Sequence, residues 1–261
     1  MAATAIAFDK VSKSFDGSRV RAVDTVSLAV AQGEFLAIVG GSGSGKTTLL
    51  RLANRLIDAD SGTILIDGDD IAAGDPIALR RRIGYVFQSA GLFPHMSVAE
   101  NVGITPRLTG APQDKTAARV SELLALVRLD SAKYRGRFPH ELSGGERQRV
   151  GVARALAAEP KILLMDEPFG ALDPLTRDSL GEDFRSLHTK LGLTTIMITH
   201  DMTEAMLLAD RIGVMRLGML VATGTAHELA ASNEPYVREL MSTPRRQTAR
   251  LNALMIDAGP R

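Results

Sequence analysis

The chain has 261 residues, and its 31 Lys and Arg against 30 Asp and Glu give a formal net charge of +1 at pH 7. Its 45% hydrophobic and 23% charged residues match an average globular protein, which excludes a disordered or collagen-like chain. The sequence contains no cysteine, so disulfide scaffolds, thiolate nucleophiles and cysteine-based metal sites are excluded as well. A near-neutral chain gives no electrostatic reason to expect a nucleic-acid partner.

The hydrophobic runs are too short for a membrane span. The longest uninterrupted ones have five residues, as in Phe35–Val39 and Leu123–Val127, whereas a transmembrane helix needs about 20. The first ten residues, MAATAIAFDK, lack the basic and apolar regions of a secretory signal. We therefore expect a soluble chain, so that any work at a membrane requires a second, membrane-spanning polypeptide.

Residues 4–39 predict short strands separated by turns, among them the turn at Ala31-Gln32-Gly33. Phe35–Val39 is apolar at every position, as expected for a central strand that is buried on both faces. It runs directly into a glycine-rich segment, residues 40–48, which is followed by the helix-forming run Leu49–Ala53. A strand, a glycine loop and a helix in this order are typical of a phosphate-binding site.

Further along the chain, predicted strands and helices alternate. Ser61–Gly68 predicts a strand between turns, and residues 97–158 are mostly helical in pattern, with apolar positions every three or four residues. Ile162–Met165 and Thr195–Ile198 predict two more short buried strands. The alternation indicates an α/β fold interrupted by a helical insert. From Thr243 onwards the hydrophobic periodicity is lost, which predicts a C-terminal tail.

The glycine-rich segment fits the phosphate-binding pattern GxxxxGK[ST], from Gly40 to Thr47. Its glycines permit positive φ angles and let backbone N–H groups converge on phosphate oxygens. We expect Lys46 to reach the β- and γ-phosphates and the Thr47 hydroxyl to bind Mg²⁺. A flexible glycine turn is the alternative, and the flanking strand and helix argue against it. The predicted nucleotide-binding residues are Gly40, Gly41, Ser42, Gly43, Ser44, Gly45, Lys46, Thr47 and Thr48.

Two carboxylates follow the apolar strand Ile162–Met165. Asp166 is expected at the carboxyl edge of the sheet, beside the glycine loop, where it can bind Mg²⁺ directly or through water. Glu167 can then act as the general base on an attacking water. Taken alone, acidic residues after a strand usually form a solvated loop. Together with the glycine loop, they predict a site that hydrolyses a nucleotide.

A second glycine-rich segment, Leu142–Glu146 (LSGGE), stands between these two motifs. Ser143 and the amides of Gly144 and Gly145 at a helix N-terminus form a second phosphate cradle, although one chain does not need two cradles for one phosphate. In this setting LSGGE resembles the signature motif of the ATP-binding subunits of ABC transporters, with Glu146 where many members have Gln. In that family two chains form a head-to-tail dimer, and each signature faces the phosphate loop of the other chain.

The resemblance covers roughly residues 4–238 and implies roles for further residues. Phe15 corresponds to the aromatic residue that stacks on adenine, with a core phenylalanine as the alternative. Gln88 corresponds to the glutamine that approaches Mg²⁺ and the water and senses the permease. Asp173 ends the loop that crosses the dimer interface, and His200 corresponds to the histidine that contacts the γ-phosphate. The implied catalytic residues are Lys46, Gln88, Glu167 and His200, and the implied Mg²⁺ ligands are Thr47, Gln88 and Asp166.

The resemblance also implies the fold and the partners. The fold would be a P-loop NTPase cassette of the α/β class, with a mixed sheet core, an antiparallel β subdomain and an inserted helical subdomain at about residues 89–160, followed by a tail at 239–261. ATP and Mg²⁺ are the implied cofactors. The implied partners are a second copy of the chain, transmembrane permease subunits and, indirectly, a solute-binding protein, with no nucleic acid. The chain would lie at the cytoplasmic face of the inner membrane, held there by the permease.

Three segments resemble the ATPases of osmoprotectant importers, which take up glycine betaine, choline, carnitine and proline: Asn54–Leu56, Leu79–Val86 and Gln88–His95. The run Arg80-Arg81-Arg82 inside the second segment is interpreted as a solvated helix face rather than a polyanion site. The implied function is the ATP-hydrolysing motor of an importer for a quaternary-amine osmoprotectant. Two alternatives stay open: the ATPase of an importer for an amino acid, a polyamine or an anion, and a soluble ABC ATPase without a transport role.

Overall fold

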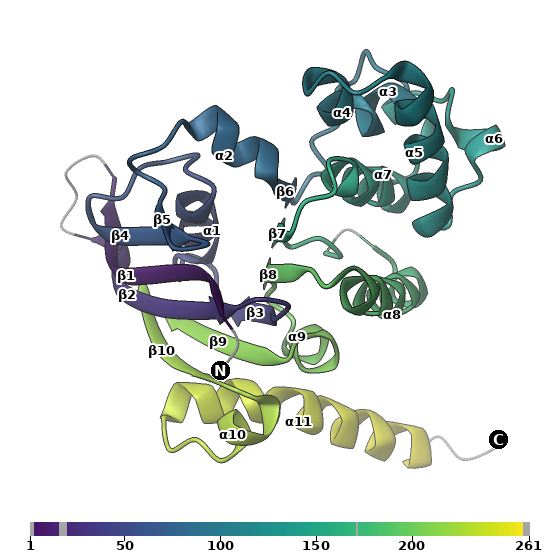
Figure 1. Cartoon of the computed structure of the whole chain (residues 1–261). Coiled ribbons are helices and arrows are strands. Elements are labelled where there is room, and N and C mark those ends of the chain that lie inside the picture. The colour runs from purple at the N-terminus through teal and green to yellow at the C-terminus, as the bar shows by residue number, and fades with distance from the viewer. Residues whose placement is uncertain (1–2, 16–19, 171, 258–261) are drawn as a thin grey trace.

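Two sheets and a lobe of helices make up the computed structural model, which describes residues 3–15, 20–170 and 172–257 (Figure 1). The strands are β1 (Thr4–Ser14), β2 (Arg21–Ala31), β3 (Phe35–Val39), β4 (Ser61–Ile66), β5 (Asp69–Asp70), β6 (Ile83–Val86), β7 (Ile162–Asp166), β8 (Thr194–Ile198), β9 (Arg211–Arg216) and β10 (Met219–Gly224). The helices are α1 (Lys46–Ala53), α2 (Pro76–Arg82), α3 (Val98–Val102), α4 (Ile104–Leu108), α5 (Gln113–Leu126), α6 (Ser131–Tyr134), α7 (Gly144–Leu156), α8 (Pro174–Leu191), α9 (Met202–Leu208), α10 (Ala226–Ala230) and α11 (Pro235–Asp257), with a short 3₁₀ turn at Pro139–Glu141.

The larger sheet has the strand order β10-β9-β3-β8-β7-β6. All its pairings are parallel except that of β10 with β9, which is antiparallel. The carboxyl ends of parallel strands meet at one edge of a sheet, and ligands of such sheets bind there. The segments that follow β3, β6, β7 and β8 therefore emerge together, and they carry the candidate site.

Strand β3 is buried at every position because a core covers each face of the larger sheet. Phe35, Ala37 and Val39 pack into the core that also includes the helices of the insert and α8. Leu36 and Ile38 point to the opposite core, which is shared with β1, β2, β4 and α1. This alternation is the period of two of a β-strand. An all-apolar strand is thus explained by two cores rather than by one.

The smaller sheet, β2-β1-β4-β5, is antiparallel throughout. Helices α3 to α7 leave the chain between β6 and β7 and form the lobe at the upper right of Figure 1. These helices fall within residues 98–156, inside the range in which we expected a helical subdomain. The predicted fold class is confirmed: a mixed sheet with helices, an antiparallel β subdomain and a helical insert.

The C-terminal segment differs from the expected tail. Helix α11 starts at Pro235 and continues to Asp257, so the boundary expected at residue 239 lies inside a helix. The helix passes through Pro244, which has no N–H to donate. Residues 245–250 are all exposed, and an exposed helix needs no apolar stripe. This exposure explains why the sequence loses its hydrophobic periodicity where the backbone stays helical.

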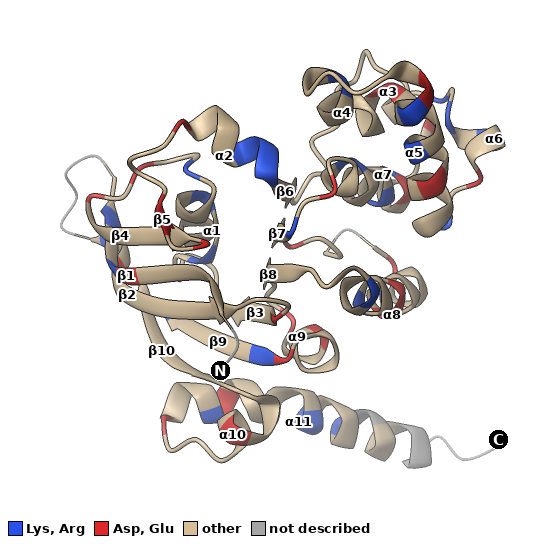
Figure 2. Cartoon of the chain, viewed as in Figure 1, with Lys and Arg blue, Asp and Glu red and all other residues tan. Residues whose placement is uncertain are grey.

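Positions of Lys and Arg and positions of Asp and Glu both occur in the sheet region and in the lobe of helices (Figure 2). In α2, Arg80 Nε donates to the carbonyl of Asn54 at 3.3 Å, and Arg82 forms an ion pair with Asp67 at 3.4 Å. These contacts agree with the interpretation of Arg80–Arg82 as a solvated helix face. No helix in the described ranges combines the length and the apolar character that crossing a bilayer requires.

Candidate functional site

The loop between β3 and α1 encloses the side chain of Lys46. Lys46 Nζ donates to the carbonyl oxygens of Gly40, at 2.8 Å, and of Gly41, at 2.9 Å. The lysine is only 7% exposed, and this burial lowers its pKa, while the negative charges of Glu167 and Asp166 act in the opposite direction. The loop therefore holds an ammonium group inside its own backbone, at the N-terminus of a helix.

Two glycines of this loop occupy positions that no other residue fits. Gly45 has a φ of 100°, and a Cβ there would collide with the carbonyl oxygen of Ala22. Gly40 has a φ of 153°, and a Cβ there would collide with the carbonyl oxygen of Met215. Glycine alone allows the backbone to pass this close to its neighbours. A glycine loop at a helix N-terminus with a buried ammonium group fits a polyphosphate.

Thr47 connects α1 to the end of β7. Its Oγ1 donates to Asp166 Oδ1 at 3.2 Å. Asp166 is 5% exposed, and its burial raises the pKa of the carboxyl group. Burial, with a further contribution from the charge of Asp166, also raises the pKa of Tyr85 to about 12. Mg²⁺ is usually bound by one or two protein oxygen ligands together with the phosphates of a substrate. The Thr47 hydroxyl and the Asp166 carboxylate, beside a phosphate loop, are oxygen ligands of this kind.

Metal binding by protein side chains alone is not indicated here. Across the described ranges no group of three or more His, Cys, Asp or Glu residues is placed to hold an ion. The Thr47–Asp166 pair supplies two oxygen-bearing side chains. It therefore fits an ion that is completed by a phosphate ligand better than a metal held by a full protein cage.

Glu167 lies at the centre of a second cluster at the same sheet edge. Its Oε2 accepts a hydrogen bond from Gln88 Nε2 at 3.1 Å and lies 3.2 Å from His200 Nδ1. Its backbone N–H donates to the carbonyl of Ile198 at 3.0 Å, which ties the turn after β7 to β8. The structure thus brings together Gln88, Glu167 and His200, which the sequence analysis assigned as catalytic from three separate segments.

Ser143 begins α7 as its N-cap residue. Its Oγ accepts from the N–H of Glu146 at 3.2 Å, and Glu146 Oε2 accepts from the N–H of Ser143 at 2.7 Å, which is a complete capping box. Tyr134 donates its hydroxyl to Glu146 Oε1 at 2.6 Å. The Tyr134 hydroxyl, with the N–H of Ser143, lowers the pKa of Glu146. Both carboxylate oxygens of Glu146 therefore accept hydrogen bonds.

The signature segment packs against the segment that precedes α8. A Cβ on Gly145 would lie 3.1 Å from Leu172 Cδ2, and Asp173 caps α8 by accepting from the N–H of Thr176 at 3.0 Å. Ser143, Gly145 and Asp173 line one cavity of about 350 Å³, whose lining includes no residue of the phosphate loop or of the Glu167 cluster. The predicted nucleotide residues therefore form two separate groups within one chain.

Phe15, at the end of β1, is not a core residue. Its side chain is 46% exposed, and Lys13 Nζ lies 5.8 Å from the centroid of its ring. The alternative of a core phenylalanine is therefore not supported. An exposed ring retains a face on which a base could stack.

Sequence reasoning missed the residues that hold the segment after Gln88. Arg154 of α7 donates to the carbonyls of Ala90, at 2.7 Å, and Gly91, at 2.6 Å, and Gln148 donates to the carbonyl of Phe87 at 3.1 Å. Both side chains are buried. They connect the Gln88 segment to the helix that Ser143 begins. Arg154, which stands between Ala153 and Ala155, was a signal that the sequence offered, whereas Gln148 stands between two other polar residues and offered none.

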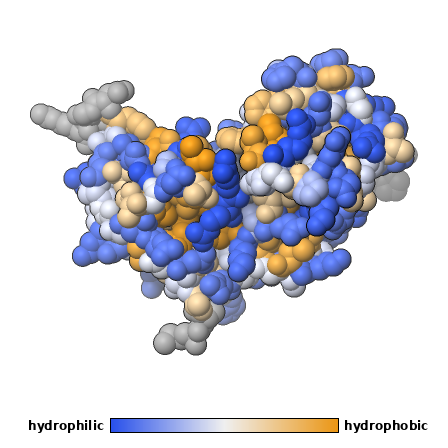
Figure 3. All heavy atoms as spheres, turned by 45° about the horizontal axis from the view of Figure 1, so that its top comes forward, coloured by the Kyte–Doolittle hydropathy of each residue, from blue (hydrophilic) through white to orange (hydrophobic). Residues whose placement is uncertain are grey.

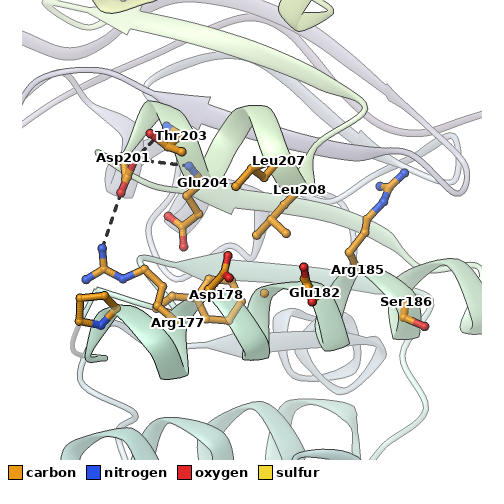
Figure 4. Close-up of a pocket in the computed structure, with 13 residues that line it drawn as sticks. Arg177, Asp178, Glu182, Arg185, Ser186, Asp201, Thr203, Glu204, Leu207 and Leu208 are labelled. Carbon is orange, nitrogen blue, oxygen red and sulfur yellow. Dashed lines mark hydrogen bonds and ion pairs between the residues drawn. The ribbon is translucent and has the colours of Figure 1, made fainter. Parts of the chain in front are cut away.

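A larger cavity lies away from these motifs. It has a volume of about 530 Å³ and lies in the groove between α8 and α9 (Figure 4). The arginines at its rim already have partners, because Arg177 pairs with Asp201 at 3.6 Å and Arg185 with Asp210 at 2.5 Å. None of the predicted nucleotide residues lines it. Cavity size therefore does not mark the candidate site in this molecule.

Comparison with known proteins agrees with these motifs. The family model of the ABC transporter matches residues 23–170. The glycine betaine/carnitine/choline transport ATP-binding protein OpuCA of Bacillus subtilis (strain 168) is 51% identical over 221 residues, which are 85% of this chain and 58% of that protein. The chain thus spans less than two thirds of the length of this relative. The sulfate/thiosulfate import ATP-binding protein CysA 2 of Agrobacterium fabrum (strain C58 / ATCC 33970) is 45% identical over 244 residues, which are 92% of this chain and 70% of that protein.

A solved structure matches the fold. It is the dimeric post-hydrolysis state of the ATP-binding cassette MJ0796, bound to ADP and phosphate. The match has a TM-score of 0.78 at 31% identity and covers 84% of this chain and 98% of that one. The arrangement of sheets and helices is therefore that of a known ATP-binding cassette.

Proposed function

This chain belongs to the ATP-binding family of ABC transporters, and we propose that it hydrolyses ATP to drive a membrane importer. The observation that carries the proposal is the meeting of two groups at one sheet edge. One is the buried Lys46 inside its glycine loop, and the other is the contact of Glu167 with Gln88 and His200. A loop that binds phosphates beside a carboxylate that can activate water is the arrangement that nucleotide hydrolysis requires.

In this proposal each residue of the sheet edge has one task. The loop amides and the Lys46 ammonium hold the phosphates of ATP. The Glu167 carboxylate takes a proton from the water whose oxygen forms the new bond to the γ-phosphorus, while the bond from that phosphorus to the ADP oxygen breaks. Gln88 and His200 orient the water and the γ-phosphate. Mg²⁺, held by Thr47 and Asp166 with Gln88 nearby, would neutralise charge on the phosphates.

The second cradle supports a dimer. Ser143 and Asp173 line a cavity apart from the phosphate loop of their own chain, and the MJ0796 cassette is described as a dimer. A head-to-tail pair would place the Ser143 cradle of each chain opposite the phosphate loop of the other. Two composite ATP sites would then form, and neither would be complete in a single chain.

A permease would dock next to Gln88. Phe87 and Phe93 are 42% and 40% exposed, and they flank the segment that α7 anchors. Figure 3 shows apolar surface on both sides of the notch between the sheet region and the lobe of helices. Exposed aromatic residues next to a catalytic glutamine suit a partner that must sense nucleotide turnover. Transmembrane subunits bound there would hold the chain at the cytoplasmic face of the membrane, and a solute-binding protein would deliver the cargo to them.

For the cargo, we infer a quaternary-amine osmoprotectant such as glycine betaine or choline. Support comes from OpuCA, whose name includes glycine betaine, carnitine and choline and whose identity to this chain is 51%. The sulfate/thiosulfate relative, at 45% identity, favours a second candidate, an inorganic anion. The choice has to be tested by transport, because an ATPase of this kind contacts the permease and not the cargo.

Uptake by a strain that lacks this chain tests the proposal. The strain would be assayed with radiolabelled glycine betaine, choline, carnitine, proline and sulfate, each at low external concentration. Expression of the wild-type chain should restore the lost uptake, and expression of the Lys46→Ala chain should not. Loss of betaine or choline uptake supports the cargo. Loss of sulfate uptake alone would replace the cargo but keep the importer, and unchanged uptake of all five solutes would refute the importer for these solutes.

A further inference from the structure

The phosphate loop has a partner far away in the sequence. The backbone N–H of Gly41 donates to the hydroxyl oxygen of Tyr236 at 2.9 Å, across 195 residues of chain. Tyr236 lies in the first turn of α11, which comes after the last strand, β10, and the short helix α10. No motif of the nucleotide site includes this tyrosine.

The hydrogen bond that Gly41 donates to Tyr236 and the one that Lys46 donates to Gly40 lie on opposite sides of one peptide unit. The N–H of Gly41 and the carbonyl of Gly40 belong to the same peptide unit. Lys46 Nζ donates to that carbonyl at 2.8 Å, while the N–H donates to Tyr236. One peptide plane is therefore held on one side by the catalytic lysine and on the other by the tyrosine. Hydrogen bonds in such a chain polarise and orient one another.

Tyr236 is itself fixed by its surroundings. The Arg216 guanidinium carbon lies 4.9 Å from the centroid of the tyrosine ring, close enough for a cation–π contact. The carboxylate of Glu234 accepts from the N–H of Tyr236 and, at 3.2 Å, from that of Val237. Val237 is fully buried and anchors the first turn of α11 in the core. The hydroxyl is therefore presented by a side chain with little freedom to move.

The loop has a second support from the C-terminal part of the chain. Gly218, in the turn between β9 and β10, donates its N–H to the carbonyl of Ser44 at 3.1 Å, and it accepts from the N–H of Asp24 at 2.9 Å. The hairpin β9–β10 and the helix α11 therefore contact the loop at two points, near its start and near its end. The residues between these two points include Gly43, which has a φ of 73° and where an added Cβ would meet no atom within 4 Å.

We propose that Tyr236 is a positioning residue of the nucleotide site, a role that rests on the proposed function. Its hydroxyl fixes the peptide unit that receives Lys46, so that the glycine loop keeps the shape that binds phosphate. Without the hydroxyl, the exposed N–H of Gly41 bonds to water, and a loop rich in glycine gains backbone freedom that nucleotide binding must then remove. The site therefore extends to the C-terminal helix, and displacement of α11 weakens ATP binding.

The first test is Tyr236→Phe in the full-length chain, which keeps the ring against Arg216 and removes only the hydroxyl. Nucleotide affinity is measured by calorimetry with ADP and with a non-hydrolysable ATP analogue, since the chain has no tryptophan to report binding. One exposed hydrogen bond is lost, so we expect the dissociation constant to rise about three- to tenfold. The KM for ATP should rise by the same factor, while kcat stays within about twofold. An affinity equal to that of the wild type would overturn the proposal.

A double-mutant cycle with Gly41 separates this role from a general effect on the fold. Gly41→Ala keeps the N–H, and its Cβ would make only an ordinary contact, 3.6 Å from the tyrosine oxygen. Gly41→Pro removes the N–H. Tyr236→Phe should weaken binding in the Ala background and have no further effect in the Pro background. An equal further loss in both backgrounds would refute the contact as the cause.

Hydrogen exchange serves if the Pro variant does not fold. Tyr236→Phe should speed amide exchange in the peptide that covers residues 40–45 and leave the strands of the smaller sheet unchanged. Unchanged exchange in that peptide would overturn the proposal. The function itself is checked with Lys46→Ala in the same assays. If Lys46→Ala loses nucleotide binding while Tyr236→Phe binds as the wild type does, only this inference fails.

Discussion

The two predicted phosphate cradles of this chain, residues 40–48 and Leu142–Glu146, differ in what their polar groups contact. In the loop of residues 40–48, the charged group is Lys46, which is buried and bound by the carbonyls of the loop. In the signature segment, the side chain in question is Ser143, which is exposed and whose hydroxyl accepts from its own helix. Beside the first cradle, Glu167 contacts Gln88 and His200. The second cradle lines a cavity that none of these three residues lines.

This difference indicates that the two segments have different roles in nucleotide binding. The loop around Lys46 carries its own charge and lies at the sheet edge where Glu167 and Asp166 emerge, so we expect it to supply the main contacts to the phosphates of a nucleotide. The Ser143 segment offers helix-terminal amides but no cation of its own within the motif. It therefore suits a role in which it completes a site that another chain begins.

Lys46→Ala should have the largest effect. Removal of the ammonium takes away the point charge on the phosphates, and we expect kcat/KM for ATP to fall about 10³-fold, the scale of losing one preorganised electrostatic contact. The fold should persist, because the side chain contacts loop carbonyls rather than the core. Hydrolysis is measured with the purified permease complex, and the matched control is Lys190→Ala, an exposed lysine at the end of α8. Normal turnover in Lys46→Ala would remove the loop from the site.

Glu167→Gln should separate chemistry from binding. Gln has nearly the same shape but cannot take a proton from water, so kcat should fall about 10²-fold or more while ATP still binds. ATP-bound dimers would then accumulate, and size-exclusion chromatography with MgATP should show a shift from monomer to dimer. Glu182→Gln, an exposed carboxylate of α8, is the control and should behave as the wild type. Full hydrolysis by Glu167→Gln would mean that another group is the general base.

The sequence alone predicts a site residue when the role of that residue depends on its neighbours in the chain, and not when it depends on contacts between distant segments. The strand, loop and helix around Lys46 and the pair Asp166-Glu167 were predictable, because their chemistry depends on neighbours in the chain. The contact of Glu167 with Gln88 and His200 came from the family resemblance, since three separate segments make it. The anchoring of the Gln88 segment by Arg154 was not predictable. It depends on backbone carbonyls, which every residue has and no motif records.

A mixed dimer tests whether Ser143 acts on the partner. One chain carries Lys46→Ala and the other Ser143→Arg. In a head-to-tail dimer, both defects fall in one site, and the other site is intact, so we expect about half of the wild-type turnover if the sites act independently. If each Ser143 instead served its own chain, both sites would be defective and turnover would vanish. Homodimers of either variant serve as the zero reference, because both of their sites carry a defect.

The smallest effect concerns Glu146, whose two oxygens stabilise the start of the signature helix. The Tyr134 hydroxyl and the N–H of Ser143 hold its pKa below 4.5 in the folded chain. A carboxyl group whose pKa is lowered by folding stabilises the protein above its unfolded pKa, and this stabilisation is lost as the pH falls through the folded value. Glu146→Gln keeps the shape of the cap and removes the charge, so we expect a loss of about 0.5 kcal/mol at pH 7.

Urea unfolding at pH 7 and at pH values well below the ordinary pKa of a glutamate measures this loss, because the gap between Glu146→Gln and the wild type should close only as the pH falls through the lowered pKa of Glu146. Glu100→Gln is the matched control. Ser97 and Glu100 form the same capping box at the start of α3, and the N–H and hydroxyl of Ser97 lower the pKa of Glu100 without a tyrosine hydroxyl among the causes. The control should therefore show the smaller gap. A loss at position 146 that is the same at both ends of the pH range would mean that its charge does not support the signature helix. In that case the loss would come from the altered hydrogen bonds to Tyr134 and Ser143 and not from the missing charge.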